Sequence, residues 1–162
     1  MPKGKIICGF AGIGKTYVGL NCPNVIDLES SDFKWQYLMD VDKEKRKGID
    51  EKIKNPNWPN NYVDKIIEKQ KEYDYVLISL DLDVRKLLKE KGYSYIVCFP
   101  NKEDKSKFLA RYKKRGNNDK FISNISLNYE KWIDDLMLEE NKIILKSGQY
   151  LEDVLKEEII KF

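Results

Sequence analysis

The segment GFAGIGKT at residues 9–16 constrains the fold of this chain more than any other feature. It fits the pattern G-x-x-x-x-G-K-[ST], follows the apolar run KIIC and precedes a stretch that is compatible with a helix. Gly9, Gly12 and Gly14 allow the backbone to turn tightly and to direct successive N–H groups at phosphate oxygens. The segment therefore predicts a phosphate-binding loop between a buried strand and a helix.

Individual residues of this loop have separate expected roles. We expect Lys15 to contact the β- and γ-phosphates of ATP and the Thr16 hydroxyl to bind Mg²⁺. The positive N-terminal end of the following helix would add to the attraction for phosphate. The alternative is a glycine-rich turn that carries an ordinary surface lysine. The predicted cofactor-binding residues are Gly9, Ala11, Gly12, Ile13, Gly14, Lys15, Thr16 and Tyr17.

Short apolar runs rich in Val, Ile and Tyr alternate with longer segments of helical periodicity. The runs are apolar on both faces, which is typical of strands in a covered parallel sheet. This alternation predicts an α/β fold with a central, mainly parallel five-stranded sheet flanked by helices. The expected strands are 5–10, 24–30, 73–80, 93–100 and 141–147. The expected helices are 60–72, 83–91, 102–114, 119–136 and 151–159, with Gly92 and Asp119 as helix stop and cap.

The chain length of 162 residues predicts a single domain over 1–162. Within it, residues 32–62 are expected to form an excursion on the acceptor side of the ligand cleft. The stretch 40–61 has the weakest pattern, and we expect it to be helical in part and then a loop broken by Pro56 and Pro59.

Acidic side chains gather where the second expected strand ends. Asp27 and Glu29 share one face because side chains alternate along a strand, and Asp32 follows them. In an open parallel sheet, ligands bind at the carboxyl ends of the strands. We expect Asp27 or Glu29 to orient or deprotonate an acceptor hydroxyl, and Asp27 to hold Mg²⁺ through water. Alternatively the acids are solvated charges beside a helix cap formed by residues 30–32.

The basic segment 101–120 carries eight Lys and Arg residues against three acids. Arg111 and Arg115 are four residues apart and so share one face of a helix that ends near Gly116. We expect this segment to act as a lid whose two arginines close over the transferring phosphoryl group. The alternative is that Arg111 and Arg115 belong to a solvated basic face of this helix.

Composition excludes several other classes of protein. There is no His, and none of the three cysteines forms a C-x-x-C pair, so a structural zinc site is excluded. We interpret Cys8 and Cys98 as buried inert thiols. A net charge of +3 does not by itself favour nucleic-acid binding. No signal peptide or membrane-length apolar run is present, so we expect a cytoplasmic protein without membrane association.

Two motifs of other nucleotide-binding classes match poorly. NKED at 101–104 has the letters of the guanine-binding N-K-x-D motif, but it follows Pro100 into the basic segment and is interpreted as a coincidence. The third expected strand ends in Ser79, with Asp81 two residues later, which is a poor Walker B motif.

Aromatic residues flank the expected acceptor pocket and could stack on a nucleobase, although core positions are the commoner role: Phe33, Trp35, Tyr37, Trp58 and Tyr62.

The order of GFAGIGKT, an acid-bearing second strand, RYKKRGN and a closing IILKSGQYLEDVL resembles the nucleoside monophosphate kinase-like branch of P-loop kinases. The segment YDYVLISLDLDVRKLLKEKGYSYIVCFP followed by RYKKRGN also resembles small bacteriophage proteins classed as nucleotide kinases. The resemblance implies an α/β, three-layer P-loop fold and a kinase lid that contains Arg111 and Arg115. Asp27-x-Glu29 is similar to the acceptor- and Mg²⁺-contacting D-x-D acids of shikimate-type kinases. Asp83-Val84-Arg85 only approaches the D-R pair of the family.

Together these features predict an ATP-dependent phosphotransferase that acts on a nucleotide, a nucleoside or a similar small hydroxyl or phosphate acceptor. Its catalytic residues would be Lys15, Asp27, Glu29, Arg111 and Arg115, with ATP and Mg²⁺ as cofactors. Two alternatives stay open: a kinase of a modified base in DNA, and a non-catalytic ATP-binding module that acts through a protein partner. The sequence leaves the oligomeric state undetermined.

Overall fold

The computed structural model describes residues 4–37 and 52–161, and its centre is a five-stranded sheet in the order β2-β5-β1-β6-β7. Every pairing in this sheet is parallel. The strands are β1 (Lys5–Gly9), β2 (Val25–Asp27), β5 (Tyr75–Ile78), β6 (Ile96–Pro100) and β7 (Lys142–Leu145). The expected α/β fold is therefore confirmed, and each of the five expected runs contains one of these strands.

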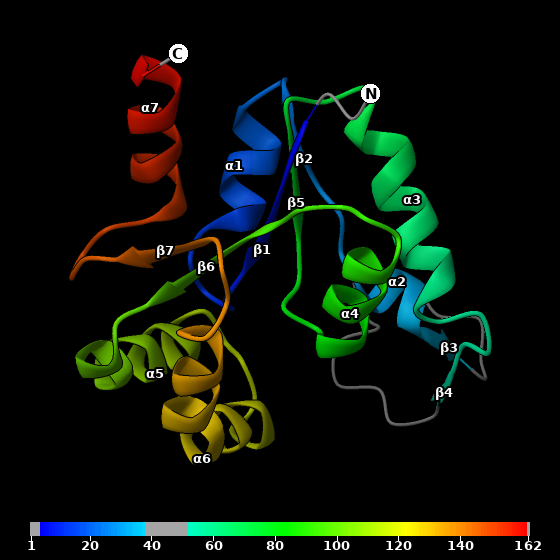
Figure 1. Cartoon of the computed structure of the whole chain (residues 1–162). Helices are drawn as coiled ribbons and strands as arrows, with labels where there is room; N and C mark the ends of the chain where they lie inside the picture. Colours follow the sequence, from blue (N-terminus) through cyan, green and yellow to red (C-terminus); the bar gives the residue numbers. More distant parts are fainter. Residues whose placement is uncertain (1–3, 38–51, 162) are drawn as a thin grey trace.

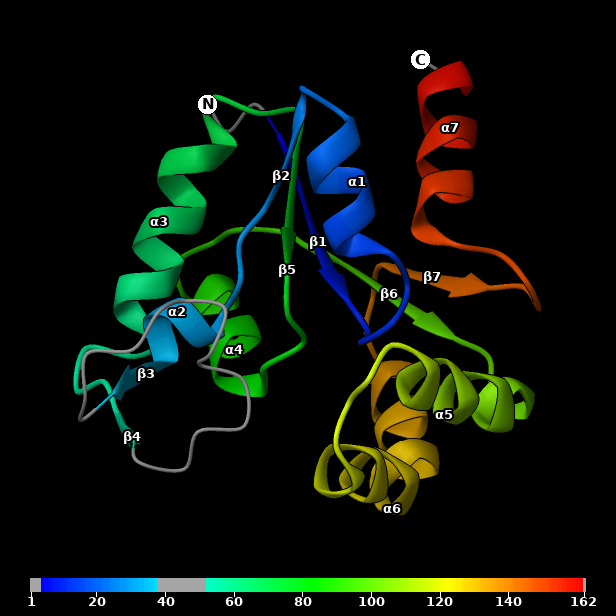
Figure 2. The ribbon, with the colours of Figure 1, turned by 180° about the vertical axis from the view of Figure 1, so that it is seen from behind.

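Helices cover both faces of the sheet. Figures 1 and 2 place α1 and α7 together on one side and α3 with α4 on the other, while α5 and α6 lie near the end of β1. The helices are α1 (Lys15–Asn21), α3 (Asn60–Gln70), α4 (Leu82–Glu90), α5 (Lys105–Lys114), α6 (Asp119–Leu136) and α7 (Leu151–Lys161). A 3₁₀ turn (Lys102–Asp104) precedes α5. None of the described helices is both long enough and apolar enough to cross a membrane.

The central strands β1 and β5 are buried because helices pack on both faces of a parallel sheet, which explains their continuous apolar sequences. All four residues of β5 are buried, as are Ile6, Ile7 and Cys8 of β1. Burial raises the pKa of Cys98 to about 12 and raises that of Cys8 further. Both thiols are thus buried and protonated, in agreement with their predicted inert role.

The region between β2 and α3 differs from the expectation. A short helix α2 (Ser31–Lys34) leads into β3 (Trp35–Tyr37), which pairs antiparallel with β4 (Lys52–Lys54). No strand was predicted here, because three-residue strands are too short to show an alternating pattern. The part of the predicted helical stretch 40–61 that falls on residues 40–51 lies outside the described residues, and residues 52–54 are strand rather than helix.

Two predicted helix boundaries can be compared with the structure. Gly92 follows the end of α4 with a φ of 82°, as a C-terminal stop requires. The cap of α6 is Asn118 rather than Asp119, because the Asn118 side chain accepts a hydrogen bond from the Phe121 N–H while Asp119 is already helical.

Candidate functional site

The predicted phosphate-binding loop joins β1 to α1, at the carboxyl end of a central strand. Gly12 and Gly14 have φ angles of 85° and 97°, in the left-handed region that favours glycine. Gly9 is needed for a different reason, because a Cβ there would lie 2.7 Å from Cδ of Lys15. The three glycines of the motif therefore serve local backbone geometry and close packing, as the pattern predicts.

The backbone carbonyls of this loop all have donors. Lys15 Nζ donates to the carbonyl oxygens of Gly9 at 2.7 Å and Phe10 at 3.3 Å, and the backbone N–H of Leu151 donates to that of Ile13 at 2.9 Å. Two side chains of α5 donate to the carbonyls of the residues in between, Ala11 and Gly12. Carbonyls held in this way cannot turn toward a bound anion.

The N–H groups of the loop are less engaged. Those of Gly12 and Gly14 donate to no acceptor among the described residues. Backbone N–H groups without protein partners, next to a lysine, form the type of concave site that binds phosphate oxygens. The pKa of Lys15 is lowered mainly by burial, while Asp27 and Glu29 act in the opposite direction. A phosphate beside the ammonium group would offset that burial.

Asp27 at the end of β2 lies against the start of α1. The Thr16 hydroxyl donates to its Oδ2 at 3.5 Å, and a Cβ on Gly19 would lie 2.8 Å from its Cβ. The absence of a side chain at Gly19 thus permits the close approach of helix and strand. Burial raises the pKa of Asp27, with Lys15 opposing the shift. The structure therefore brings together the two residues that were predicted to act on Mg²⁺, Thr16 and Asp27.

Glu29 and Asp32 lie farther out along the same edge. Glu29 is exposed, accepts a hydrogen bond from the Ser31 hydroxyl at 3.1 Å, and influences the pKa of both Lys15 and Arg115. Asp32 is exposed in the first turn of α2. Ser30 occupies the cap position of α2 but makes no capping hydrogen bond with its side chain. A helix does begin beside these acids, and Glu29 and Asp32 are exposed there, as the alternative interpretation expects.

Helix α5 contributes two adjacent side chains to the loop. Arg111 Nη1 donates to the Gly12 carbonyl at 2.6 Å, and the Tyr112 hydroxyl donates to the Ala11 carbonyl at 2.7 Å. The Arg111 guanidinium also lies between two rings, 4.2 Å from the centroid of Phe108 and 4.3 Å from that of Tyr150. Arg111 is thus placed against the loop, as the lid hypothesis requires, and it bonds a loop carbonyl in this structure.

Arg115 lies one turn further along the chain. Its guanidinium stands 5.1 Å from the ring centroid of Tyr112, and its Nε donates to the side chain of Asn117. The two arginines therefore both contact aromatic side chains of the α5–α6 region, with Arg111 nearer the phosphate-binding loop.

Two lysines of the remaining basic segment form ion pairs with α6 at the protein surface. Lys102 pairs with Asp134 and Lys105 pairs with Glu130 at 2.8 Å, so these lysines link the start of α5 to α6. The NKED letters have a structural role, because the Asn101 side chain accepts from the Asp104 N–H and caps the 3₁₀ turn. This supports interpreting the N-K-x-D match as a coincidence.

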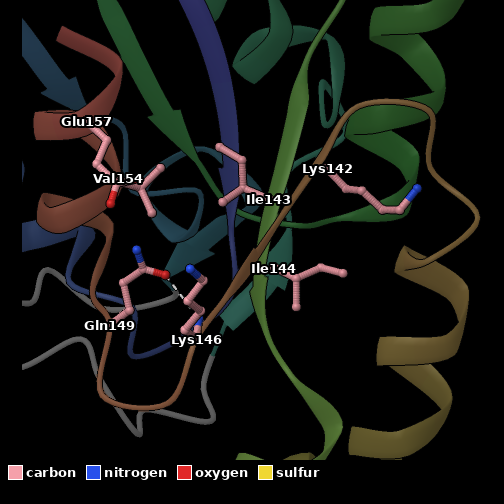
Figure 3. Close-up of a pocket in the computed structure, with 7 residues that line it drawn as sticks. All are labelled: Lys142, Ile143, Ile144, Lys146, Gln149, Val154 and Glu157. Atoms are coloured by element: carbon pink, nitrogen blue, oxygen red, sulfur yellow. Dashed lines mark hydrogen bonds between the residues drawn. The ribbon is translucent and has the colours of Figure 1, made fainter. Parts of the chain in front are cut away.

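A cavity of about 290 Å³ adjoins the loop and is lined by Gly14, Tyr17, Tyr150 and Glu152. Tyr17 and Tyr150 are 54% and 42% exposed, so both rings are available to a ligand that reaches the cavity. A second hollow of about 290 Å³ lies at β7 and α7. Figure 3 shows Lys142 and Ile144 pointing away from Val154 and Glu157 there, so Lys142 and Glu157 do not converge.

Residues at the end of β5 complete the acceptor side. The Ser79 hydroxyl donates to Asp81 at 2.9 Å, and Asp81 pairs with Lys34 at 3.4 Å. Arg85, which was compared with the family's D-R pair, instead forms an ion pair with Glu139 at 3.0 Å. Of the aromatic residues considered for base stacking, Tyr62 is fully buried and Trp58 nearly so, which identifies both as core residues.

Two residues beside the loop, Tyr112 and Tyr150, escaped the sequence reasoning, and Tyr62 was considered only for base stacking. Tyr112 and Tyr62 look like core positions at helical spacing, and Tyr150 sits in a loop without a motif. The predicted lid arginines, Arg111 and Arg115, were the signal that pointed to this part of α5. Within the described residues, no group of three or more His, Cys, Asp or Glu side chains converges in a way that could hold a metal ion.

No protein-family model and no curated protein matches the chain in sequence. Among solved structures, it is similar to the tunicamycin resistance protein of Deinococcus radiodurans, with a TM-score of 0.58 and 17% sequence identity. The alignment covers 98% of this chain and 95% of that chain. At this identity the likeness concerns the fold alone, which is an α/β, P-loop-like fold. The resemblance to bacteriophage nucleotide kinases stays a prediction.

Proposed function

We propose that this protein is an ATP-dependent phosphotransferase whose acceptor is a nucleotide, a nucleoside or a similar small molecule with a hydroxyl or phosphate group. The observation that carries the proposal is the loop at residues 9–14, whose carbonyls are held by other groups while the N–H groups of Gly12 and Gly14 have no described partner. Such a loop suits the phosphates of a nucleotide, and the cavity beside Gly14 suits its base.

Each side chain has a separate task in this proposal. Lys15 would exchange its carbonyl partners for the β- and γ-phosphates of ATP. The aromatic rings of Tyr17 and Tyr150 would flank the base. The acceptor oxygen would form a bond to the γ-phosphorus as the bond to the β,γ-bridging oxygen breaks and ADP leaves. Where the acceptor is a hydroxyl, its proton would pass to the carboxylate of Asp27 or Glu29.

The residues present fit a magnesium ion bound together with ATP. Mg²⁺ usually keeps several waters and needs only one or two protein oxygens beside the substrate phosphates, so a site without three converging acids is compatible with it. Thr16 would supply its hydroxyl and Asp27 its carboxylate, which lie 3.5 Å apart. The ion would neutralise charge on the transferring phosphoryl group.

The two alternatives differ in their support. A kinase of a modified base in DNA would use the basic segment to follow the strand, but ion pairs with α6 already engage Lys102 and Lys105. A non-catalytic ATP-binding module is favoured by Ser79, because β5 ends without the acidic residue of a Walker B motif. Such a module would bind ATP and be indifferent to replacement of Glu29.

The decisive experiment is phosphate transfer from γ-labelled ATP with Mg²⁺ to a panel of nucleosides, nucleoside monophosphates and oligonucleotides. Wild type is assayed beside Lys15→Ala. Transfer to one member of the panel, abolished in the variant, would establish the phosphotransferase and identify its acceptor. Binding of ATP without transfer to any member would contradict the proposal and favour the non-catalytic module.

A further inference from the structure

Three tyrosines with completely buried side chains share one arrangement: Tyr62, Tyr112 and Tyr129. The hydroxyl of each donates to a backbone carbonyl, at 2.6 Å to Leu28, 2.7 Å to Ala11 and 2.8 Å to Asn101 respectively. Burial raises the pKa of all three, so each hydroxyl keeps its proton and acts as a donor. The three bonds are chemically alike and differ in the backbone segment that they hold.

Tyr112 acts on the phosphate-binding loop. Its acceptor, the Ala11 carbonyl, lies between the carbonyls that Lys15 and Arg111 hold. A Cβ at Gly12 would lie 2.8 Å from Cε1 of Tyr112, so the ring also packs directly on the loop. The ring itself is held edge-on by Phe121, at a centroid distance of 5.4 Å. Tyr112 is therefore a rigid support that reaches the loop from α5.

Tyr62 acts on the opposite wall of the site. Its acceptor is the carbonyl of Leu28, the residue between Asp27 and Glu29. The Leu28 N–H donates to the Leu77 carbonyl at 2.9 Å, so both backbone groups of this residue are bonded. Ser79 also acts on the Tyr62 hydroxyl, because it opposes the effect of burial on the pKa of that group. Tyr62 thus joins the end of β2 to the end of β5 at the point where the acids leave the sheet.

We propose that Tyr112 and Tyr62 are positioning residues for the two substrates. Tyr112 holds the loop that binds the phosphate donor, and Tyr62 holds the backbone that aims the two acids at the acceptor. This inference rests on the proposed phosphotransferase function and adds two residues that contact neither substrate. Tyr129 makes an equivalent bond to Asn101, beyond β6. Its ring packs on Phe10 of the loop but its hydroxyl does not bond the loop, so Tyr129→Phe, which keeps the ring, serves as the matched control.

Replacement by phenylalanine isolates the hydroxyl, because the ring and its packing remain. Each replacement leaves one buried carbonyl without its donor, so all three variants should lose thermal stability. Only two of them should change the site. Tyr112→Phe should weaken ATP binding about tenfold, as expected when a loop is no longer held in its binding conformation. Tyr62→Phe should lower kcat or raise the acceptor KM about tenfold, with ATP affinity unchanged.

The experiment measures three quantities for wild type and the three Phe variants. These are the dissociation constant for ATP–Mg²⁺ without acceptor, the kcat and both KM values with acceptor, and Tm. The expected pattern is an ATP defect confined to Tyr112→Phe, an acceptor or turnover defect confined to Tyr62→Phe, and neither in Tyr129→Phe. A further variant, Phe121→Leu, loosens the packing of the Tyr112 ring but keeps its hydroxyl, and should lower Tm with a smaller change in ATP affinity than Tyr112→Phe.

Equal kinetic and binding constants in all three Phe variants would overturn the inference. Losses of ATP affinity or of kcat that are proportional to the loss of Tm in all three variants would also overturn it. Failure of the proposed function is a separate outcome. A wild-type protein that binds ATP but transfers phosphate to no acceptor would remove the Tyr62 role together with the proposed function. The ATP dissociation constants would still decide the Tyr112 role, because equal values for Tyr112→Phe and Tyr129→Phe contradict it.

Discussion

The phosphate-binding loop and the acidic edge of β2 form the two walls of the site, and they are built differently. Side chains or backbone groups from three separate parts of the chain hold the carbonyls of residues 9–13. Glu29, by contrast, is exposed and bonds mainly to its close neighbour Ser31. The donor wall is thus preorganised, whereas the acceptor wall has one fixed point at Leu28 and exposed carboxylates beyond it.

This difference is consistent with the chemistry proposed for each wall. All nucleoside triphosphates present the same phosphates, so a rigid cradle of backbone groups suits any of them. Acceptors differ between enzymes of one fold, and specificity resides in side chains grafted onto the fold. We therefore expect replacements at the loop to affect every activity of the protein, and replacements at the acidic edge to affect transfer alone.

The largest effect is expected for Lys15→Ala. Loss of the cation that contacts the phosphates should reduce transfer by at least about two orders of magnitude, as removal of one preorganised charge-stabilising donor typically does. Initial rates at saturating ATP measure this effect. Lys86→Ala, which removes an exposed lysine from α4, is the control and should retain full activity. Equal loss in both variants would show that the loop is not the donor wall.

Glu29→Gln should separate the two walls most clearly. Removing the charge while keeping the shape should lower kcat by about ten- to a hundredfold if the carboxylate takes or orients the acceptor proton. The dissociation constant for ATP should stay within about twofold of wild type, because Glu29 belongs to the acceptor wall. Calorimetric titration with ATP–Mg²⁺ and steady-state kinetics test both expectations. Unchanged kcat would assign the acceptor step to Asp27 alone.

Gly12→Ala tests the rigidity of the loop through stability and binding. Alanine at position 12 would have to keep the unfavourable positive φ of this residue, at a cost of about 1–2 kcal/mol. Its Cβ would also lie 2.8 Å from the buried Tyr112 ring. Gly92→Ala is a matched control, since its φ is 82° and nothing lies within 4 Å of the new Cβ. Urea unfolding should show a greater loss for Gly12→Ala, together with weakened ATP binding. Equal losses would mean that the loop moves aside freely.

Asp27→Asn should stabilise the folded protein at neutral pH, whereas Gly12→Ala destabilises it, and the effect should be smaller. The pKa of Asp27 is raised in the folded protein, so the folded state holds this proton more tightly than the unfolded state does. The contribution of Asp27 to the free energy of unfolding is therefore favourable at pH values below its pKa in the unfolded chain. It is lost as the pH rises through its pKa in the folded protein. The variant should match wild type at acidic pH and have a higher Tm at neutral pH, while its transfer activity falls. A Tm difference that is independent of pH would contradict this assignment.

Salt should have the smallest effect. Transfer to a small acceptor should change by less than about threefold between 50 and 200 mM salt, because few charges are brought together from solution. A nucleic-acid acceptor that contacts several basic residues would instead lose affinity by orders of magnitude over the same range. Comparison of a mononucleoside with an oligonucleotide acceptor across salt concentrations separates the two cases.

The fold could be predicted from the sequence because its signals are local. Runs that are apolar on both faces indicate strands that helices cover on both sides. The glycine-rich segment 9–16 indicates a tightly turning loop between a strand and a helix. The positive φ angles of Gly12 and Gly14 follow from residue type and spacing within a few positions. The pairing of β3 with β4 could not be predicted, because three residues per strand are too few to reveal a period.

The residues that complete the site depend on tertiary structure. Tyr112 and Arg111 lie 101 and 99 positions from the loop residues that they hold, and only the placement of α5 against the loop that follows β1 brings them there. The sequence by itself determined that the loop would form and that acids would end β2. Which side chains support each wall was decided by the fold, because a hydrogen bond between distant segments requires relative placement that no local pattern encodes.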